Sequence, residues 1–375
     1  MMALRTDIDP DGLLEFSVVF TDRSLNHMSA GFQQVMRDIS GVLRDVYKAD
    51  AVAIVPGGGT YAMESVARQF ATDKKVLVIR NGFFSFRWSQ IFAMGHIPAQ
   101  ETVIMAHRTG NARDAPFSPP AIQDVVARIH DVKPDVVFAP HVETASGMIL
   151  PDDYIRAVAD AVHAVGGIFV LDCIASGTVW VNMQETGVDV LISAPQKGWS
   201  APPSAGLVMM NARARDMAKA ATSTSFALDL AKWLSIMEAY EDGGHAYHAT
   251  MPTDALRILR DAMFEARDIG FETLAAAQWQ LGNAVRAALA KRGVKSVAAE
   301  GFAAPGVVVS YTNNPDIKAG KAFAARGVQI AAGVPLMVEE GADYSSFRLG
   351  LFGLDKLADV EATLARLEAV LDQVL

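Results

Sequence analysis

Seven short apolar runs, separated by segments of helical periodicity, constrain the fold of this chain more than any other feature. Each run is about as long as one β-strand. The runs cover residues 51–55, 75–80, 101–107, 135–140, 168–172, 189–193 and 207–210. Amphipathic segments such as 63–70, 121–129 and 153–165 lie between several of them. This alternation predicts an α/β fold, in which parallel strands are joined by crossover helices that cover both faces of the sheet.

The pattern after Met210 is mainly helical and predicts a second, smaller domain. Helical segments are expected at 226–241, from 253 to about 292, and at 358–375, with short strands at 306–310 and 346–351. A chain of 375 residues is also long for a single core. We therefore expect a large domain over residues 16–250 and a small C-terminal α/β domain over 251–375. Residues 1–15 would form an N-terminal extension.

Composition excludes several classes of function. The net charge of −9 comes without long charge runs, so a nucleic acid is not expected as a partner. No apolar stretch approaches the length of a membrane span, and the acidic N-terminus does not resemble a signal sequence. The one cysteine, Cys173, excludes an internal disulfide and fits a reducing compartment, so we expect a cytoplasmic protein.

Two ionisable residues follow neighbouring apolar runs. Asp172 ends one run, and Lys197 comes shortly after the next, within Ser193-Ala194-Pro195-Gln196-Lys197-Gly198. Ligand sites in open α/β sheets lie beyond the carboxyl ends of the strands. Pyridoxal phosphate needs such a pair, because a lysine amine forms the Schiff base and an acid keeps the pyridine nitrogen protonated. A solvated lysine that caps a strand is the alternative interpretation.

Other residues at strand ends suit the same cofactor. The loop Pro56-Gly57-Gly58-Gly59-Thr60 precedes a helical segment, where free amides and the helix dipole favour phosphate. Phe84 follows the second run and could stack on a flat ring. Thr144 could donate to the ring edge, and Gln196 is placed to reach a phosphate oxygen. Taken singly, the alternatives are a tight turn, a core phenylalanine and an ordinary polar loop.

In order along the chain, these segments resemble the class V aminotransferases, and most of all their alanine/serine–glyoxylate (serine–pyruvate) branch. Besides the Gly-rich loop and Phe84, the resemblance rests on ordered segments from about residue 51 to the C-terminus. They are Glu143-Thr144-Ala145-Ser146-Gly147, Asp172-Cys173-Ile174-Ala175-Ser176, Ser193-Ala194-Pro195-Gln196-Lys197, Ala201-Pro202-Pro203, Leu228-Asp229-Leu230-Ala231-Lys232-Trp233-Leu234, Tyr247-His248-Ala249-Thr250-Met251-Pro252 and Phe347-Arg348-Leu349-Gly350. The resemblance implies fold type I of pyridoxal-phosphate enzymes, with a mostly parallel seven-stranded sheet in the large domain.

The resemblance also implies a role for each matching residue. Lys197 would form the Schiff base and move a proton between the substrate Cα and the cofactor C4′. Asp172 would pair with the pyridine nitrogen, Phe84 would stack on the ring and Thr144 would bond near the ring oxygen. The phosphate would be held by Gly58, Gly59, Thr60 and Gln196, and by Tyr247 and Thr250 of a second subunit, which makes a homodimer necessary. Arg348 would bind the substrate α-carboxylate.

The expected reaction is transfer of an amino group from alanine or serine to glyoxylate or pyruvate by a ping-pong mechanism. The N-terminal segment departs from the family, because residues 16–29 replace its usual Gly-Pro-rich opening. This departure leaves the substrate pair open, and Arg23 or His27 could touch substrate. A phosphonate or another atypical amine as donor, or a lyase reaction, remains an alternative.

Three other classes fit less well. Desulfuration needs a reactive cysteine on a mobile loop, whereas Cys173 follows Asp172 in an apolar segment. A cofactor-free binding protein on this fold would be expected to have lost the lysine or its partners. The eight histidines show no metal-ligand spacing that stands apart from the family-like segments, so no metal is expected.

Overall fold

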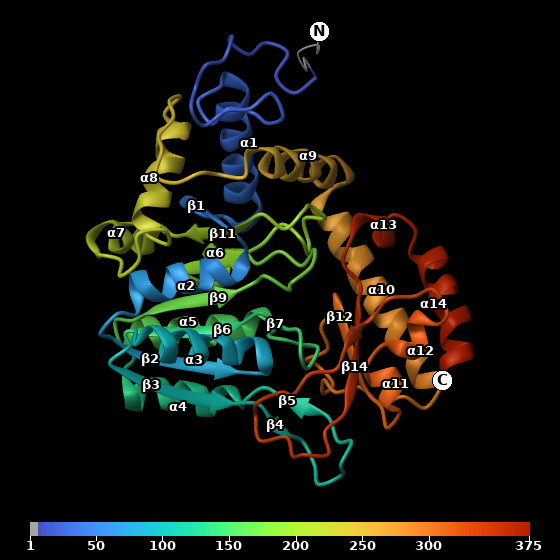
Figure 1. Cartoon of the computed structure of the whole chain (residues 1–375). Coiled ribbons are helices and arrows are strands. Elements are labelled where there is room, and N and C mark those ends of the chain that lie inside the picture. Colours follow the sequence, from blue (N-terminus) through green and yellow to red (C-terminus); the bar gives the residue numbers. More distant parts are fainter. Residues whose placement is uncertain (1–6) are drawn as a thin grey trace.

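The computed structural model describes residues 7–375 and confirms the predicted sheet (Figure 1). Seven strands lie in the order β1-β11-β10-β9-β6-β2-β3. Their bounds are β1 Ala51–Pro56, β2 Lys75–Arg80, β3 Gln100–Met105, β6 Val136–Pro140, β9 Ile168–Asp172, β10 Val190–Ser193 and β11 Ala205–Met210. Each agrees closely with a predicted run. All of them except the edge strand β3 are largely buried and read as continuous apolar sequence.

Strand β11 is the one member of this sheet that runs against its neighbours, β1 and β10. The connection from β10, residues 194–204, contains no helix, so the chain turns back directly and does not cross over. The other pairs are parallel, and Asp172 is opposite both Pro140 of β6 and Ile192 of β10. The carboxyl ends of these central strands therefore meet at one edge of the sheet.

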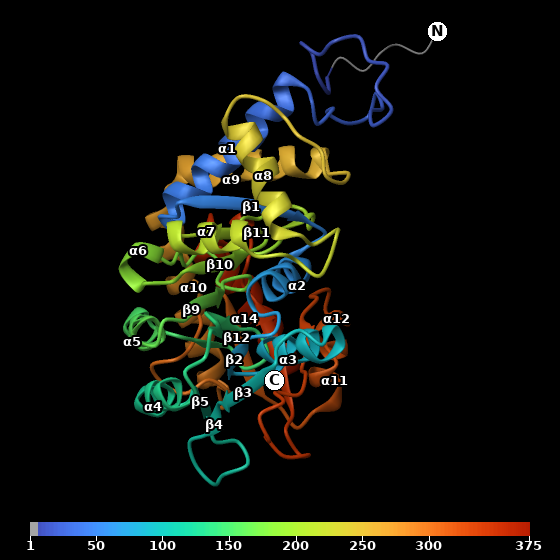
Figure 2. The same cartoon turned by 90° about the vertical axis from the view of Figure 1, so that its left-hand side faces the viewer.

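Helices cover the sheet on both sides, as Figure 2 shows. Helices α2 (Gly59–Phe70) and α3 (Phe83–Gly95) lie on one side, and α4 (Ile122–Val132), α5 (Asp152–Ala164) and the short α6 (Met183–Thr186) lie on the other. Helix α7 (Ala212–Ala220) packs against β11. Two small hairpins, β4 (His107–Arg108) with β5 (Phe117–Ser118) and β7 (Val142–Glu143) with β8 (Met148–Ile149), follow β3 and β6.

One long helix had no counterpart among the predicted elements. Helix α1 (Ala30–Tyr47) begins after Ser29, whose hydroxyl accepts a hydrogen bond from the backbone N–H of Phe32. It packs against α8 (Leu230–Glu241) and α9 (Thr253–Ile269). Helix α8 begins four residues later than predicted, because the Asp229 carboxylate caps its N-terminus.

The C-terminal part of the chain forms a second layer beside the large sheet (Figure 1). Strands β12 (Val307–Tyr311), β14 (Ser346–Gly350) and β13 (Ala331–Ala332) form a small antiparallel sheet in that order. The helices of this part are α10 (Phe271–Lys291), α11 (Pro315–Lys318), α12 (Lys321–Ala324), α13 (Leu354–Leu357) and α14 (Val360–Val374). The two predicted strands and the closing helix are thus confirmed.

The predicted helical stretch from 253 to 292 consists of two helices that meet at Gly270. This glycine has a φ of 101°, which side chains rarely adopt and which ends α9. Leu256 and Leu259 of α9 lie in the core of the large sheet, whereas Leu274 and Leu281 of α10 lie in a second core. The division after residue 250 stays a prediction, as does an extension over 1–15, of which residues 1–6 lie outside the described part.

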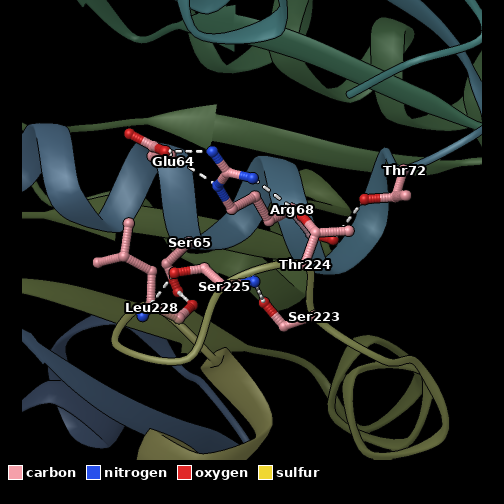
Figure 3. Close-up of polar contacts among 8 residues, drawn as sticks. All are labelled: Glu64, Ser65, Arg68, Thr72, Ser223, Thr224, Ser225 and Leu228. Atoms are coloured by element: carbon pink, nitrogen blue, oxygen red, sulfur yellow. Dashed lines mark hydrogen bonds and ion pairs between the residues drawn. The ribbon is translucent and has the colours of Figure 1, made fainter. Parts of the chain in front are cut away.

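Helix α2, whose N-terminus points to the sheet edge, is anchored along its outer side (Figure 3). Arg68 donates hydrogen bonds to Glu64 at 2.7 and 2.9 Å and to the Thr224 hydroxyl at 3.0 Å. The Ser65 hydroxyl donates to the carbonyl of Leu228 at 2.8 Å. The segment between α7 and α8 thus holds α2 in place.

Candidate active site

A cavity of about 400 Å³ lies beyond the carboxyl ends of the central strands and is closed on one side by the small sheet. Both parts of the chain line it. Of the residues singled out in the sequence, it brings together Gly59, Thr60, Phe84, Thr144, Asp172, Gln196, Lys197 and Arg348. Residues that are far apart in the sequence therefore share one cavity.

The Gly-rich loop forms one end of this cavity. Gly57 has a φ of 120°, which requires glycine, and a Cβ on Gly59 would lie 2.5 Å from Cδ1 of Ile174. Gly58 is the N-cap residue of α2 and has no side chain to cap the first turn, and it does not line the cavity itself. The free N–H groups of this turn and the hydroxyl of Thr60 suit an anion.

Asp172 is a buried carboxyl at the end of β9, with 8% of its surface exposed. One oxygen accepts a hydrogen bond from the backbone N–H of Ile174 at 2.9 Å. Burial raises the pKa of Asp172 to about 7; the nearby carboxylate of Glu143 contributes, whereas the hydrogen bond and the charge of Arg87 act in the opposite direction. A buried acid of this kind is stabilised by a cation in the cavity.

Lys197 lies in the turn that follows β10. Its pKa is lowered first by burial and then by the positive charge of Arg348. Its Nζ lies 5.0 Å from the ring centre of Phe352 and has no hydrogen-bond partner among residues 7–375. A lysine with a lowered pKa and a free amine can act as a nucleophile. The turn itself is tightly packed, because a Cβ on Gly198 would lie 2.0 Å from the carbonyl oxygen of Gly177.

Phe84 lies in the first turn of α3, close to two arginines. The guanidinium carbons of Arg87 and Arg348 are 5.2 and 5.5 Å from its ring centre. Arg348 comes from β14 and donates from Nε to the carbonyl of Ala332 at 2.8 Å. Burial lowers the pKa of Arg348, and the charge of Glu143 partly offsets this effect. The guanidinium of Arg348 makes no other hydrogen bond within residues 7–375, so its remaining N–H groups can bind a carboxylate.

Two charged residues at this site, Glu143 and Arg87, were not among the predicted site residues. Glu143 is fully buried and accepts hydrogen bonds from the backbone N–H groups of Phe84, Ser85 and Ala145. Arg87 lines the cavity three residues after Phe84. The signal for Arg87 was present, because a helix that begins at Phe83 presents positions i and i+3 on one face.

Tyr247 and Thr250 do not line this cavity. They line a separate, smaller cavity of about 80 Å³ together with His27 and His248. Tyr247 is 56% exposed, and its hydroxyl lies 3.3 Å from that of Thr250. That Tyr247 and Thr250 bind the cofactor phosphate of a second subunit stays a prediction. Arg23 pairs with the neighbouring Asp22, and neither Arg23 nor His27 lines the larger cavity.

Neither a metal-binding cluster nor a membrane-spanning helix is found among residues 7–375. Residues 7–375 contain no cluster of three or more histidine, cysteine, aspartate or glutamate side chains that could hold a metal ion. No helix in the same range is long and apolar enough to cross a membrane.

The family model "Aminotransferase class-V" matches residues 15–361. Among curated proteins, the soluble hydrogenase small subunit of Synechococcus sp. (strain PCC 6716) is 26% identical, over 93% of this chain and 88% of its own length. Alanine–glyoxylate aminotransferase 1 of Saccharomyces cerevisiae is 27% identical, over 66% of this chain and 65% of its own length. The 2-aminoethylphosphonate–pyruvate transaminase of Burkholderia mallei is 29% identical, over 66% of this chain and 64% of its own length.

Solved structures share the fold. The alanine–glyoxylate aminotransferase of Nostoc sp. superimposes with a TM-score of 0.78 at 21% identity, over 93% of this chain and 89% of its own. At this identity the likeness concerns the fold, which is fold type I of the pyridoxal-phosphate aminotransferases. The expected architecture is thereby confirmed.

Proposed function

Because this chain belongs to the class V aminotransferases and is a transaminase, we propose that it uses pyridoxal 5′-phosphate to move an amino group from a small amino acid to a 2-oxo acid. Alanine or serine would be the donor, and glyoxylate or pyruvate the acceptor. The observation that carries the proposal is the shared cavity of Asp172, Lys197 and Arg348. A cofactor acid, a nucleophilic amine and a carboxylate clamp are the minimum set for this chemistry.

The donor set of the cavity fits the cofactor. The first turn of α2 offers uncapped N–H groups to a phosphate, and Asp172 is a buried acid that a protonated pyridine nitrogen would stabilise. Phe84 supplies an aromatic face, and Thr144 and Gln196 supply polar groups to the lining of the cavity. When bound, the cofactor supplies an electron sink for the electrons released at the substrate Cα.

Arg348 and Lys197 would have separate roles in the reaction. Arg348 would bind and orient the substrate α-carboxylate, because its planar fork matches a carboxylate. Lys197 would take the proton from the substrate Cα and return it at the cofactor C4′, a step that requires an amine of lowered pKa. The second half of the ping-pong cycle would run the same steps with the 2-oxo acid.

Two features support a homodimer and a cytoplasmic location. Tyr247 and Thr250 lie on an exposed surface away from Lys197, where a second subunit could contact them. The single thiol, Cys173, is free and buried, which suits a reducing compartment.

A second donor class has its own support. The Burkholderia relative is named for 2-aminoethylphosphonate and pyruvate, and its identity to this chain is similar to that of the yeast alanine–glyoxylate enzyme. We therefore keep a phosphonate or another atypical amine as the alternative donor. A lyase reaction on the same cofactor is the other alternative.

Absorbance of the purified protein tests the cofactor. A near-visible band should be present or appear on addition of pyridoxal phosphate, and Lys197→Ala should abolish it. The matched control is Lys291→Ala, at an exposed position at the end of α10, which should keep the band. A colourless wild-type protein that cannot be reconstituted would overturn the proposal.

A substrate panel tests the donor and acceptor. Alanine, serine and 2-aminoethylphosphonate should each be assayed against glyoxylate, pyruvate and 2-oxoglutarate, except for alanine with pyruvate, which regenerates the same pair. The proposal expects the largest kcat/KM for alanine or serine with glyoxylate or pyruvate. Preference for the phosphonate would select the alternative donor, and loss of substrate without formation of a new amino acid would indicate a lyase.

A further inference from the structure

More positively than negatively charged side chains line the active-site cavity. Three cations, Arg87, Lys197 and Arg348, face a single acid, Asp172. The proposed function assigns Lys197 to the cofactor aldehyde carbon, Arg348 to the substrate carboxylate and Asp172 to the ring nitrogen. Arg87 is left without a role, although it is the one remaining charged group on the wall of this cavity.

Arg87 lies at the end of the cavity formed by the Gly-rich loop. Its Nη1 donates a hydrogen bond of 2.9 Å to Oγ1 of Thr60, the second residue of α2. Its guanidinium also lies over the ring of Phe84. Within residues 7–375 no carboxylate comes within ion-pair distance of Arg87. A half-buried guanidinium that faces a cavity without a counter-ion is suited to an anionic ligand.

The Gly-rich loop itself supplies no full positive charge. Residues 56–61 contain neither lysine nor arginine, and Gln196 is neutral. The N-terminus of a helix corresponds to only about half an elementary charge, whereas a phosphate monoester carries close to two negative charges at neutral pH. A phosphate at this end of the cavity therefore needs a cation, and Arg87 is the one that the fold places there.

We propose that Arg87 binds the phosphate group of the cofactor together with the first turn of α2. The inference rests on the proposed function, because it requires that the ligand carry its phosphate at this end. The same geometry makes Arg87 a part of the binding site that recognises the phosphate and not the ring. Removal of its charge should therefore weaken binding only of ligands that carry the phosphate.

The test compares pyridoxal phosphate with pyridoxal, which has the same ring and aldehyde but no phosphate. Cofactor-free wild type, Arg87→Gln and Arg87→Lys would be titrated with each compound, and Kd read from the near-visible absorbance. Loss of a charge-assisted contact should weaken pyridoxal phosphate about 10- to 100-fold in Arg87→Gln. Arg87→Lys should fall in between, since it keeps the charge but not the fork. Pyridoxal should bind all three proteins alike.

Inorganic phosphate gives a readout that does not depend on the Schiff base. It should compete with pyridoxal phosphate for the wild type at lower concentration than for Arg87→Gln. The matched control, Arg128→Gln on the exposed side of α4, should leave every Kd unchanged. Thermal unfolding of the cofactor-free variants checks that each is folded.

Two outcomes would overturn the inference about Arg87. Equal weakening of pyridoxal and pyridoxal phosphate would show that Arg87 only supports Phe84 or Thr60, and unchanged Kd values would show that it does not bind the phosphate. The failure of the proposed function looks different, because wild-type protein would then bind neither compound at Lys197.

Discussion

The hydroxyl of Ser85 donates a hydrogen bond of 2.6 Å to the carboxylate of Glu143, which joins the first turn of α3 to the β7–β8 hairpin. The same carboxylate accepts the backbone N–H groups of Phe84 and Ser85. A Cβ on Gly82 would lie 2.6 Å from Cγ of Glu143, so the chain approaches this carboxylate closely. Glu143 thus positions Phe84 in the cavity without lining it.

Replacement of Glu143 should destabilise the protein. Glu143→Ala removes the acceptor of several buried donors and should lower the free energy of unfolding by about 3 kcal/mol. Glu143→Gln keeps the volume and one acceptor oxygen, so its loss should be smaller, about 1–2 kcal/mol. Urea denaturation measures both, with the exposed Glu300→Ala as control. An unfolding midpoint of Glu143→Ala equal to that of wild type would contradict this role.

Arg348→Lys should impair substrate binding but leave cofactor binding intact. Lysine keeps the charge but cannot form the two parallel hydrogen bonds of a guanidinium with a carboxylate. We expect KM for both the amino donor and the 2-oxo acid to rise about 10-fold or more, which corresponds to about 1.4 kcal/mol. Steady-state kinetics checks this, and Arg366→Lys on α14 is the control. Unchanged KM values would remove Arg348 from the carboxylate clamp.

Asp172 should make the stability of the cofactor-free protein depend on pH. Burial raises its pKa to about 7 in the folded protein, while an aspartate in an unfolded chain has a pKa of about 4. Between these values the unfolded chain has lost the proton and the folded one keeps it, so stability falls as the pH rises. Below about pH 4 and above about pH 7 this contribution is constant.

The variant Asp172→Asn isolates this effect. It can still accept the hydrogen bond from Ile174 but does not titrate. The difference in free energy of unfolding between Asp172→Asn and wild type should grow in favour of the variant from pH 5 to pH 7, and then level off. Urea denaturation at several pH values measures it. Parallel pH profiles for the two proteins would disprove the assignment.

Gly198→Ala should disturb the turn that carries Lys197. The new Cβ would lie 2.0 Å from a backbone oxygen of Gly177, which cannot move aside as a side-chain end could. We expect a loss of about 2 kcal/mol or more in stability and weaker reconstitution with pyridoxal phosphate. Gly41→Ala in α1 is the control: it meets nothing within 4 Å and should stabilise the protein by about 0.5–1 kcal/mol.

Mixed dimers test whether Tyr247 and Thr250 serve a second subunit. Lys197→Ala and a Tyr247→Phe/Thr250→Ala double variant should each have little activity alone. A dimer that contains one of each would have one site with both the lysine and the intact pair, so co-expression should restore activity. Absence of any restoration in purified mixed dimers would mean that the two residues act elsewhere.

Much of this molecule was predictable from the sequence, because its central features are local. A strand buried on both faces reads as an apolar run; Asp172 ends one such run, and Lys197 comes shortly after the next. The glycines before α2 mark a turn into a helix in the same local way. Helix α1 was not predicted, although its cap, Ser29, and its apolar residues at helical spacing are local signals of the same kind.

Packing in three dimensions determines which distant residues meet. The reversed direction of β11 depends on a connection without a helix, and the meeting of Arg348 with Phe84 depends on how the small sheet packs. Glu143 and Arg87 became visible as site residues through contacts made 58 and 27 positions away in the sequence. The strands, the family and the candidate site residues could thus be predicted from the sequence, because each lies in a short segment. The arrangement of charge around them was decided by packing, because electrostatic interaction depends on distance in space and not along the chain.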